Sequence, residues 1–434
     1  MVLLVKKAGI TYLIDAFILL FQICLGFSIL PYIFGNDSKV LQLICFSLIL
    51  FFHFLRFGVP AISYIKFSPL YTILFFVLFF DFFQDSLRLG DISLIRFLQL
   101  CNFVVLLSYL YKAYKFYKIK NLVNGFYAKY IVFFPYIYYC LYVVLTIFLS
   151  FSLIMTGVLS INDNPLTESN FALGKGDLDH GMLYSFPGYL SVINLGSRLF
   201  NLPVFCGLCH EPHVSCYFIM PSLFMLLSLN LKKTEKAIII FLYLSALVLG
   251  FSATAFAVVG VCAFIHILYL AVIKGKIRAF ALFLLSAVII AFVLTPIVEE
   301  VWNNIFVSRV MSDDDSSKNI SQDFINYIIT PSDILGTGNI DEGRMLSYFA
   351  RNQIGLVTSV LDVSFFFVFL YRCLWLVFRG NDKLHFIGLA CIYFALHSLK
   401  IPMLAFHSNY IIFMCFLLTI CYNTKRSENS ISAA

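Results

Sequence analysis

The stretch ITYLIDAFILLFQICLGFSIL, residues 10–30, decides how this chain folds. It is a nearly unbroken apolar run, and a helix needs about 20 residues to cross about 30 Å of hydrocarbon. Lys6 and Lys7 precede the run, but no small-residue cleavage site follows it, so it does not match a removable signal peptide. We therefore interpret residues 10–31 as a first membrane-spanning helix.

The composition of the whole chain supports a membrane-embedded fold. The 434 residues are 61% hydrophobic, 18% aromatic and 12% charged, and the mean hydropathy is +0.92. Soluble globular proteins carry about 25% charged and about 45–50% apolar residues. Because this much apolar surface cannot be buried in a water-soluble domain, we expect a polytopic membrane protein. The formal net charge of +7 is mild, and no nucleic-acid partner is expected.

Apolar runs of spanning length recur along the chain and predict about twelve transmembrane helices in one all-α domain, residues 1–434. The expected spans are 10–31, 40–60, 69–84, 92–111, 130–155, 213–230, 237–251, 253–272, 279–297, 354–378, 384–400 and 402–422. Two long polar loops lie between them, at 156–212 and 298–353. Each loop also contains an apolar piece, 184–205 and 324–329, which we expect to form short helices along the membrane surface.

The basic residues predict the orientation of these spans. With the amino terminus inside, 18 of the 30 Lys and Arg residues fall in cytoplasmic segments and nine fall on the opposite side, mostly in the two long loops. Short cytoplasmic connections are enriched in Lys and Arg in membrane proteins. We therefore expect both termini in the cytoplasm and both long loops outside. Loops of this length usually carry function, so the working surface is expected at the outer membrane boundary.

The end of the first long loop reads CGLCHEPH, residues 206–213, and is open to four interpretations. Cys206, Cys209 and His210 match the C-x-x-C-H of covalent haem attachment, and with His213 they offer four ligands to zinc. The two cysteines can also form a disulfide outside the cytoplasm, or act as small apolar residues. Pro212 suits the first turn of a helix, where its missing N–H costs nothing.

The neighbours of this stretch form an ordered set of motifs. Arg198, Gly207 and Glu211-Pro212 precede one span, and GFSATAF at 250–256 ends a later one. The second long loop then contains ILGTG at 334–338, followed by Asp341. This order resembles that of the O-antigen polymerase and ligase superfamily over roughly residues 195–360. Two departures from the family pattern are present.

The first departure is the absence of a His from 336–353, where ligases have one shortly after G-x-G, and this favours the polymerase type. The second is Ser252-Ala253, which stands where many members carry Ser-Arg.

The resemblance implies a substrate carried on undecaprenyl pyrophosphate at the periplasmic face of a bacterial inner membrane. An oligosaccharide repeat unit leaves its pyrophosphate and joins a sugar hydroxyl of another lipid-linked unit. The leaving diphosphate needs cations, and Arg binds phosphate oxygens with a planar pair of N–H donors. The candidates on the outer side are Arg198, Arg309, Arg344 and Arg351. Lipid headgroups or nearby loop acids are the alternative partners of these arginines.

The accepting hydroxyl benefits from a general base, and Glu211 and Asp341 are the candidates. Their structural alternatives are a helix cap for Glu211 and a turn residue for Asp341. No metal or cofactor is expected, and the Asp313-Asp314-Asp315 run is interpreted as a solvated loop. The charged residues Arg56 and Arg96 fall inside spans but near their ends, where snorkelling to the interface explains them.

The expected partners are undecaprenyl-pyrophosphate-linked oligosaccharides and membrane lipid, and a chain-length regulator protein is a further candidate. Two other functions remain open from the sequence. One is an O-antigen ligase, which transfers polysaccharide to the lipid A core. The other is a lipid-linked oligosaccharide flippase, which is a transporter. A flippase needs polar residues spread through its spans, whereas the charge here is concentrated in two outer loops, and this favours the enzyme.

Overall fold

A computed structural model gives the fold, which is mostly helical in the residues that it describes. The structure describes residues 2–24, 38–89, 91–120, 133–158, 183–186, 191–194, 204–209, 212–278, 281, 285, 360–379, 382–399 and 408–432. The helices there are α1 (Val2–Cys24), α3 (Ser38–Phe57), η2 (Ile62–Phe67), α4 (Pro69–Leu89), α5 (Leu94–Lys120), α7 (Phe133–Met155), α8 (Pro212–Leu227), α9 (Lys233–Gly250), α10 (Ala253–Val272), α16 (Val360–Arg379), α17 (Asp382–Ser398) and α19 (Ser408–Ser432).

Eleven of the predicted spans coincide with α-helices in the described residues, and the span predicted at 279–297 falls almost wholly outside them. Within the described residues, three helices are long and apolar enough to cross a membrane: Arg96–Tyr117, Phe134–Met155 and Thr254–Val272. These findings confirm a mostly helical fold with apolar helices suited to a membrane. The total of twelve spans stays a prediction.

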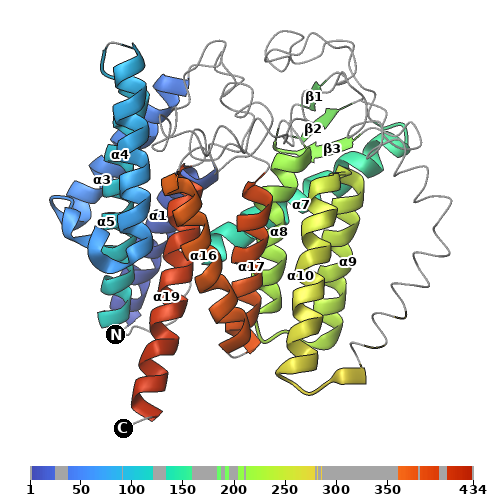
Figure 1. The fold of residues 1–434 in the computed structure, drawn as a ribbon. Helices are drawn as coiled ribbons and strands as arrows, with labels where there is room; N and C mark the ends of the chain where they lie inside the picture. The colour runs from blue at the N-terminus through green and yellow to red at the C-terminus, as the bar shows by residue number, and fades with distance from the viewer. Residues whose placement is uncertain are drawn as a thin grey trace.

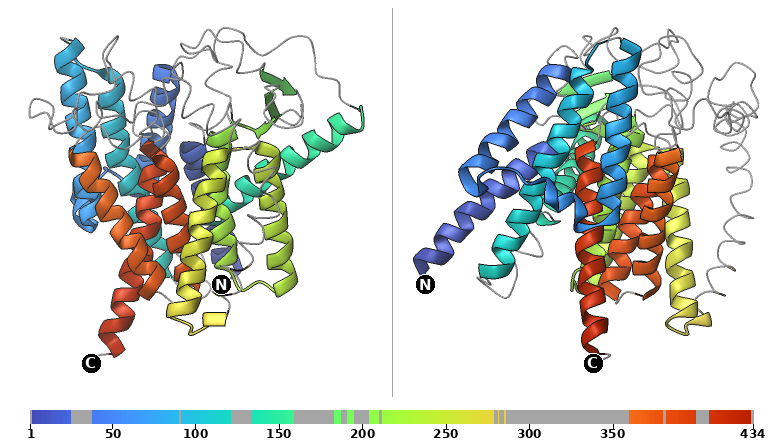
Figure 2. Two further views of the ribbon diagram at one scale, coloured as in Figure 1. Left: turned by 45° about the vertical axis from the view of Figure 1, so that its right-hand side comes forward. Right: turned by 60° about the vertical axis from the view of Figure 1, so that its left-hand side comes forward.

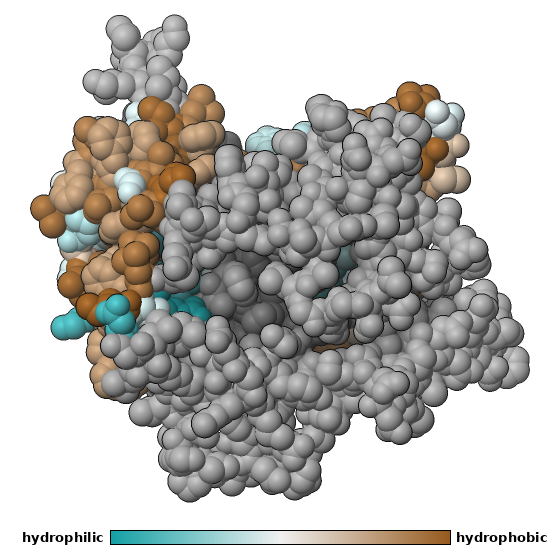
Figure 3. Space-filling view, turned by 90° about the horizontal axis from the view of Figure 1, so that it is seen from above, coloured by the Kyte–Doolittle hydropathy of each residue, from teal (hydrophilic) through white to brown (hydrophobic). Residues whose placement is uncertain are grey.

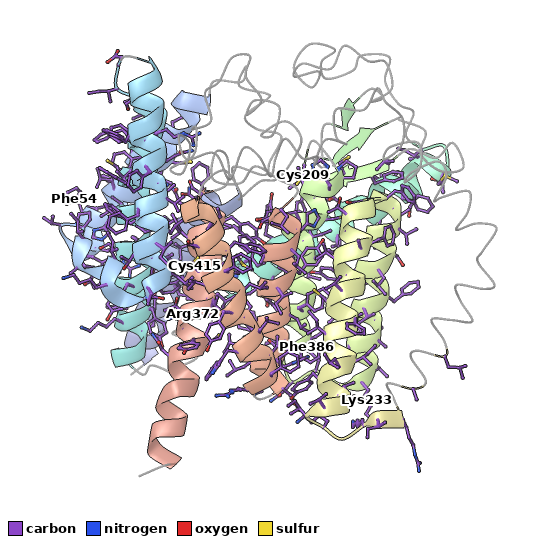
Figure 4. The ribbon with its side chains drawn as sticks, viewed as in Figure 1. Phe54, Cys209, Lys233, Arg372, Phe386 and Cys415 are labelled. Atoms are coloured by element: carbon purple, nitrogen blue, oxygen red, sulfur yellow. The ribbon has the colours of Figure 1, made fainter. Side chains whose placement is uncertain are left out.

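Large apolar side chains cover the outside of the bundle. Phe51, Phe54 and Leu55 on α3 are exposed by 60%, 50% and 65%. Figure 4 shows Phe54 pointing away from the other helices, and hydrophobic residues gather over the same flank in the view from above (Figure 3). Such a surface is costly in water and favourable in lipid, so the exposed residues support the same environment as the composition does.

The first long loop contains a small antiparallel sheet. Its strands are β1 (Leu183–Phe186), β2 (Ser191–Asn194) and β3 (Val204–Gly207), in the order β1-β2-β3. Tyr184 pairs with Ile193, and Ile193 pairs in turn with Phe205. The prediction of short helices over 184–205 is therefore wrong for these segments. Pro187-Gly188 and Pro203 interrupt any helix, and the short runs between them are rich in aromatic and β-branched residues that favour strands.

The helices form one bundle with two distinct ends (Figures 1 and 2). The sheet lies at one end, which we call the sheet end, and α1 begins and α19 finishes at the other. Helix α8 lies inside the bundle, where it packs against α7, α9, α10 and α17. Almost every residue of α8 is buried, whereas α7 runs obliquely behind it (Figure 1).

Tyrosines from the surrounding helices stabilise α8 at its internal proline. Pro221 has no N–H, so it removes a hydrogen bond from the middle of the helix. Tyr136 of α7 donates to the carbonyl of Phe218, and Tyr393 of α17 donates to the carbonyl of Cys216 over 3.3 Å. The two carbonyls lie on either side of Tyr217, whose own carbonyl loses its helical donor to Pro221. These bonds tie the central helix to two neighbours near the proline, and they satisfy hydroxyl groups that would be costly to bury alone.

Candidate functional site

The turn after β3 holds the start of α8 in place. Gly207 has a φ of 63°, in the left-handed region that favours glycine. A Cβ atom at this position would lie 2.8 Å from Cγ1 of Val143 and 3.4 Å from Cγ1 of Ile147, both on α7. The N–H of Cys209 then donates to the carbonyl of Cys206 over 3.3 Å and closes the turn. Glycine is thus required both by the backbone and by the close approach to α7.

Cys206 and Cys209 are both buried, and no disulfide joins them. Burial raises the pKa of the Cys209 thiol, so this group stays protonated at neutral pH. A protonated, enclosed thiol is a poor nucleophile and a poor metal ligand. Of the four interpretations of CGLCHEPH, the structure therefore favours small apolar residues over the disulfide. His210 lies outside the described residues, and His213 belongs to the first turn of α8.

A second motif segment lies against the same turn. Helix α9 ends at Gly250, where an added Cβ would lie 3.5 Å from the carbonyl oxygen of Phe205 on β3 and 3.5 Å from Sγ of Cys216 on α8. Phe251 follows in the left-handed conformation with a φ of 37°. Ser252 then caps α10, because its hydroxyl accepts a hydrogen bond from the N–H of Ala255 over 3.3 Å. The GFSATAF segment thus meets β3 and the first turns of α8.

The six residues that the sequence predicts for the site lie outside the described residues. They are Arg198, Glu211, Arg309, Asp341, Arg344 and Arg351. In the chain, Arg198 stands between β2 and β3, and Glu211 directly precedes Pro212. The described residues therefore define what flanks the first pair, and the four residues of the second long loop remain predictions.

An ion pair that the sequence analysis missed joins α1, α3 and α5. Arg56 contacts the carboxylate of Asp15, which is fully buried, and Tyr109 and Tyr117 donate to the same carboxylate. The Tyr117 bond measures 2.7 Å. Arg56 is thus explained by a partner inside the bundle, and snorkelling is not needed. The signal available was an acid in one predicted span and a base in the next.

Amide side chains form a second buried polar group at the sheet end. Gln22 of α1, Asn102 of α5 and Asn409 of α19 are connected by hydrogen bonds. On α5, Arg96 is buried and donates to Gln99 over 2.8 Å. Buried polar residues inside membrane helices are costly and are frequently functional. None of these residues except Arg96 was singled out from the sequence.

The opposite end of the bundle carries a cluster of titratable groups between α10 and α17. Nδ1 of His385 donates to the carbonyl of Val377 over 3.1 Å, so its Nε2 accepts from Nδ1 of His266 over 2.8 Å. Asp382 accepts from Tyr269 and pairs with Lys274, each over 2.8 Å. The hydrogen bond from Lys274 lowers the pKa of Asp382. These bonds fasten the two helices together at the end distant from the sheet.

No protein-family model, curated protein or solved structure matches this chain. The case for a function therefore depends on the order of the motifs and on the geometry described above.

Proposed function

We propose that this protein is a polysaccharide polymerase of the O-antigen polymerase type. It joins undecaprenyl-pyrophosphate-linked oligosaccharide repeat units at the periplasmic face of a bacterial inner membrane, with both termini in the cytoplasm. The observation that carries the proposal is the meeting of two motif segments, 204–209 and 250–256, at the sheet end of α8. In the chain, residues 204–209 stand between Arg198 and Glu211. The place where they meet residues 250–256 is therefore the part of the described structure that flanks the proposed site.

The ends of the bundle support the proposed orientation. Figure 4 places Cys209 at the sheet end and Lys233 at the opposite end. Lys232 lies in the turn between α8 and α9, Lys233 and Lys236 lie in the first turn of α9, and the exposed Arg278 follows α10 at the same end. A basic surface at this end agrees with the distribution of Lys and Arg that cytoplasmic connections carry. The motif segments then face the side where lipid-linked repeat units are joined.

The proposed reaction breaks the bond between the donor sugar and its phosphate oxygen. The acceptor hydroxyl oxygen forms the new glycosidic bond, its proton passes to Glu211 or Asp341, and undecaprenyl pyrophosphate leaves. Arg198 and Arg344, with Arg351 and Arg309, bind the departing diphosphate. Preorganised cations of this kind frequently give the largest catalytic contribution, and one donor is worth about 3 kcal/mol. No metal or cofactor enters this scheme.

A lipid-linked oligosaccharide flippase is the second candidate, and a specific observation favours it. Buried polar side chains occur on α1, α3, α5 and α19, as a transporter pathway requires. Asp15 and Arg56, however, neutralise one another, and the amides bond to one another, so most of this polarity is already satisfied. An O-antigen ligase is the alternative within the enzyme class.

Gene deletion followed by gel analysis of lipopolysaccharide separates the three functions. A polymerase mutant retains single repeat units on the lipid A core, a ligase mutant retains none and strands polymer on its carrier lipid, and a flippase mutant accumulates single units inside. We expect Arg198→Ala and Arg344→Ala to reproduce the polymerase phenotype at normal protein level. Arg278→Ala, at the opposite end, is the matched control and should restore the ladder. A full ladder from both site variants would remove their assignment.

A further inference from the structure

The three side-chain amides at the sheet end form a hydrogen-bonded series, which we call the amide chain. Backbone carbonyls determine which atom of each amide donates and which accepts. Nε2 of Gln22 donates to the carbonyl of Cys45 on α3 over 2.6 Å, and a carbonyl can only accept. The Oε1 atom of Gln22 is therefore an acceptor, and Nδ2 of Asn409 donates to it over 3.2 Å and to the backbone carbonyl of Gln22 over 3.1 Å. The orientation of both side-chain amides follows from these two backbone acceptors.

The orientation of the Asn102 amide, the last in this hydrogen-bonded series, follows in the same way. Because Nδ2 of Asn409 donates, its Oδ1 must accept, and Nδ2 of Asn102 donates to it over 2.6 Å. Among the residues that the structure describes, the Oδ1 atom of Asn102 is then left as an acceptor with no hydrogen-bond partner, although the residue is only 7% exposed. Flipping the amide does not remove the problem, since Nδ2 must face Asn409. Native proteins pair most buried acceptors, so this one indicates a donor that is not among the described residues.

The Asn102 acceptor lies near the sheet end of the bundle, which is the side proposed to be active. Asn409 lies in the first turn of α19 and Gln22 in the last turn of α1, both at the sheet end (Figure 1). Gln99 and Arg96 precede Asn102 at successive three-residue steps on α5, so polar side chains continue toward the start of that helix at Leu94. The acceptor is about 12 Å along α5 from its first residue.

We infer that Asn102 Oδ1 binds a sugar hydroxyl of the substrate, in a subsite formed by α1, α5 and α19. A hydroxyl group donates one hydrogen bond and needs no charge partner, which suits a neutral carbonyl acceptor. The identity of the ligand rests on the proposed function, whereas the need for a donor rests on the amide chain alone. The amide chain is the positioning device, because it holds Asn102 in one rotamer with its carbonyl directed away from Asn409.

The test measures binding of a pyrophosphate-free glycan to the purified full-length protein in lipid nanodiscs. The probe is the oligosaccharide repeat unit released by mild acid from lipid-linked material, and undecaprenyl pyrophosphate is tested in parallel. Asn102→Leu has similar volume but no polar atoms, and we expect it to weaken the glycan Kd about tenfold. Asn102→Asp, neutral when buried, keeps one donor for Asn409 and one acceptor for the ligand. Its glycan affinity should stay within about threefold of wild type.

Ser150→Ala on α7 is the matched control, since it removes a buried hydroxyl that donates to the carbonyl of Thr146 on the same helix and to no other described residue. It should bind the glycan normally. All variants should bind undecaprenyl pyrophosphate like wild type. If Asn102→Leu binds the glycan as wild type does, or if wild type binds only undecaprenyl pyrophosphate, the subsite is wrong and the acceptor holds a water. Asn102→Ala serves the same purpose if Asn102→Leu does not accumulate.

The two proposals fail separately in these experiments. A deletion strain with an intact ladder, combined with glycan binding that depends on Asn102, would leave a glycan site on a protein that is not the polymerase. A lost ladder, combined with normal glycan binding by Asn102→Leu, would leave the polymerase and remove the subsite.

Discussion

The buried ion pair between Asp15 and Arg56 gives a prediction with a magnitude. The carboxylate is fully buried and the Arg56 side chain is 14% exposed, so neither charge is solvated after its partner is removed. Breaking a buried pair by removing one partner costs about 3–5 kcal/mol, because it leaves an uncompensated charge. Asp15→Leu also removes the acceptor of Tyr109 and Tyr117, so its loss should lie toward the upper end of that range.

The double variant Asp15→Leu/Arg56→Met distinguishes pairing from simple packing. Replacing both charges with apolar residues removes the uncompensated charge, and such replacements are frequently neutral or stabilising. We expect each single change to lower the free energy of unfolding by about 3 kcal/mol or more. The double change should lower it by less than either single change, so the coupling energy should be at least about 3 kcal/mol.

Denaturant unfolding of the purified protein in detergent provides the assay. Trp375 packs on Tyr422 with ring centroids 4.6 Å apart, so its fluorescence reports on the contact between α16 and α19. The control is Asp91→Ala, which removes an exposed carboxylate and should change stability by no more than about 0.5 kcal/mol. Single losses that simply add in the double variant would refute the pairing.

Three further predictions concern other parts of the described structure. Gly207→Val should lower the free energy of unfolding by about 2 kcal/mol or more, because the side chain clashes with α7 and the backbone has a positive φ. Gly58→Ala lies in open space at a φ of 69° and should cost about 1 kcal/mol. Thermal unfolding compares the two variants. Cys209 should resist maleimide in the folded protein even at pH 9 and react after unfolding, as mass spectrometry will show, because burial raises its pKa. Asp382→Asn should lower the unfolding temperature at neutral pH, and the difference from wild type should shrink as the pH falls below about 4 and vanish only below the lowered pKa of Asp382. The pKa of Asp382 is lowered by Lys274, so its stabilisation is present above the ordinary carboxyl pKa and is lost as pH falls through the lowered one.

Each of these three predictions has an outcome that would contradict it. Equal losses at both glycines would show that the contact with α7 is not close. Rapid labelling of the folded protein would show an accessible thiol. A stability difference that does not shrink at all between pH 7 and about pH 2 would show that the Asp382 carboxylate does not act through its ionised form.

The helices of the described residues could be predicted from the sequence, and their neighbours could not. An apolar run of about 20 residues is a local signal, so α10 (Ala253–Val272) coincides with the span predicted at 253–272. The pairing of Asp15 with Arg56 depends on which helices pack together, and no local pattern encodes that. Hydropathy likewise overlooked β1 to β3, because strands of four residues are too short for a periodic signal.

The candidate site also has features that the sequence predicts and features that only the packing of the helices reveals. The resemblance singled out Gly207 by its place in the order of motifs, but the reason that glycine is needed there lies in Val143 on another helix. The approach of Gly250 to Phe205 also joins segments that are distant in sequence. The acceptor on Asn102 emerges only when three helices contribute to one hydrogen-bond chain, so no single stretch of sequence carries that signal.

The central claim is that outer-loop arginines bind a diphosphate while one lipid-linked unit is transferred to another. Purified protein in liposomes, supplied only with the lipid-linked single repeat unit, tests it most directly. We expect longer lipid-linked chains and one undecaprenyl pyrophosphate released for each new linkage, with a rate at least about a hundredfold lower in Arg198→Ala. Full-length products from Arg198→Ala at the wild-type rate, or no chain growth by the wild-type protein, would contradict it.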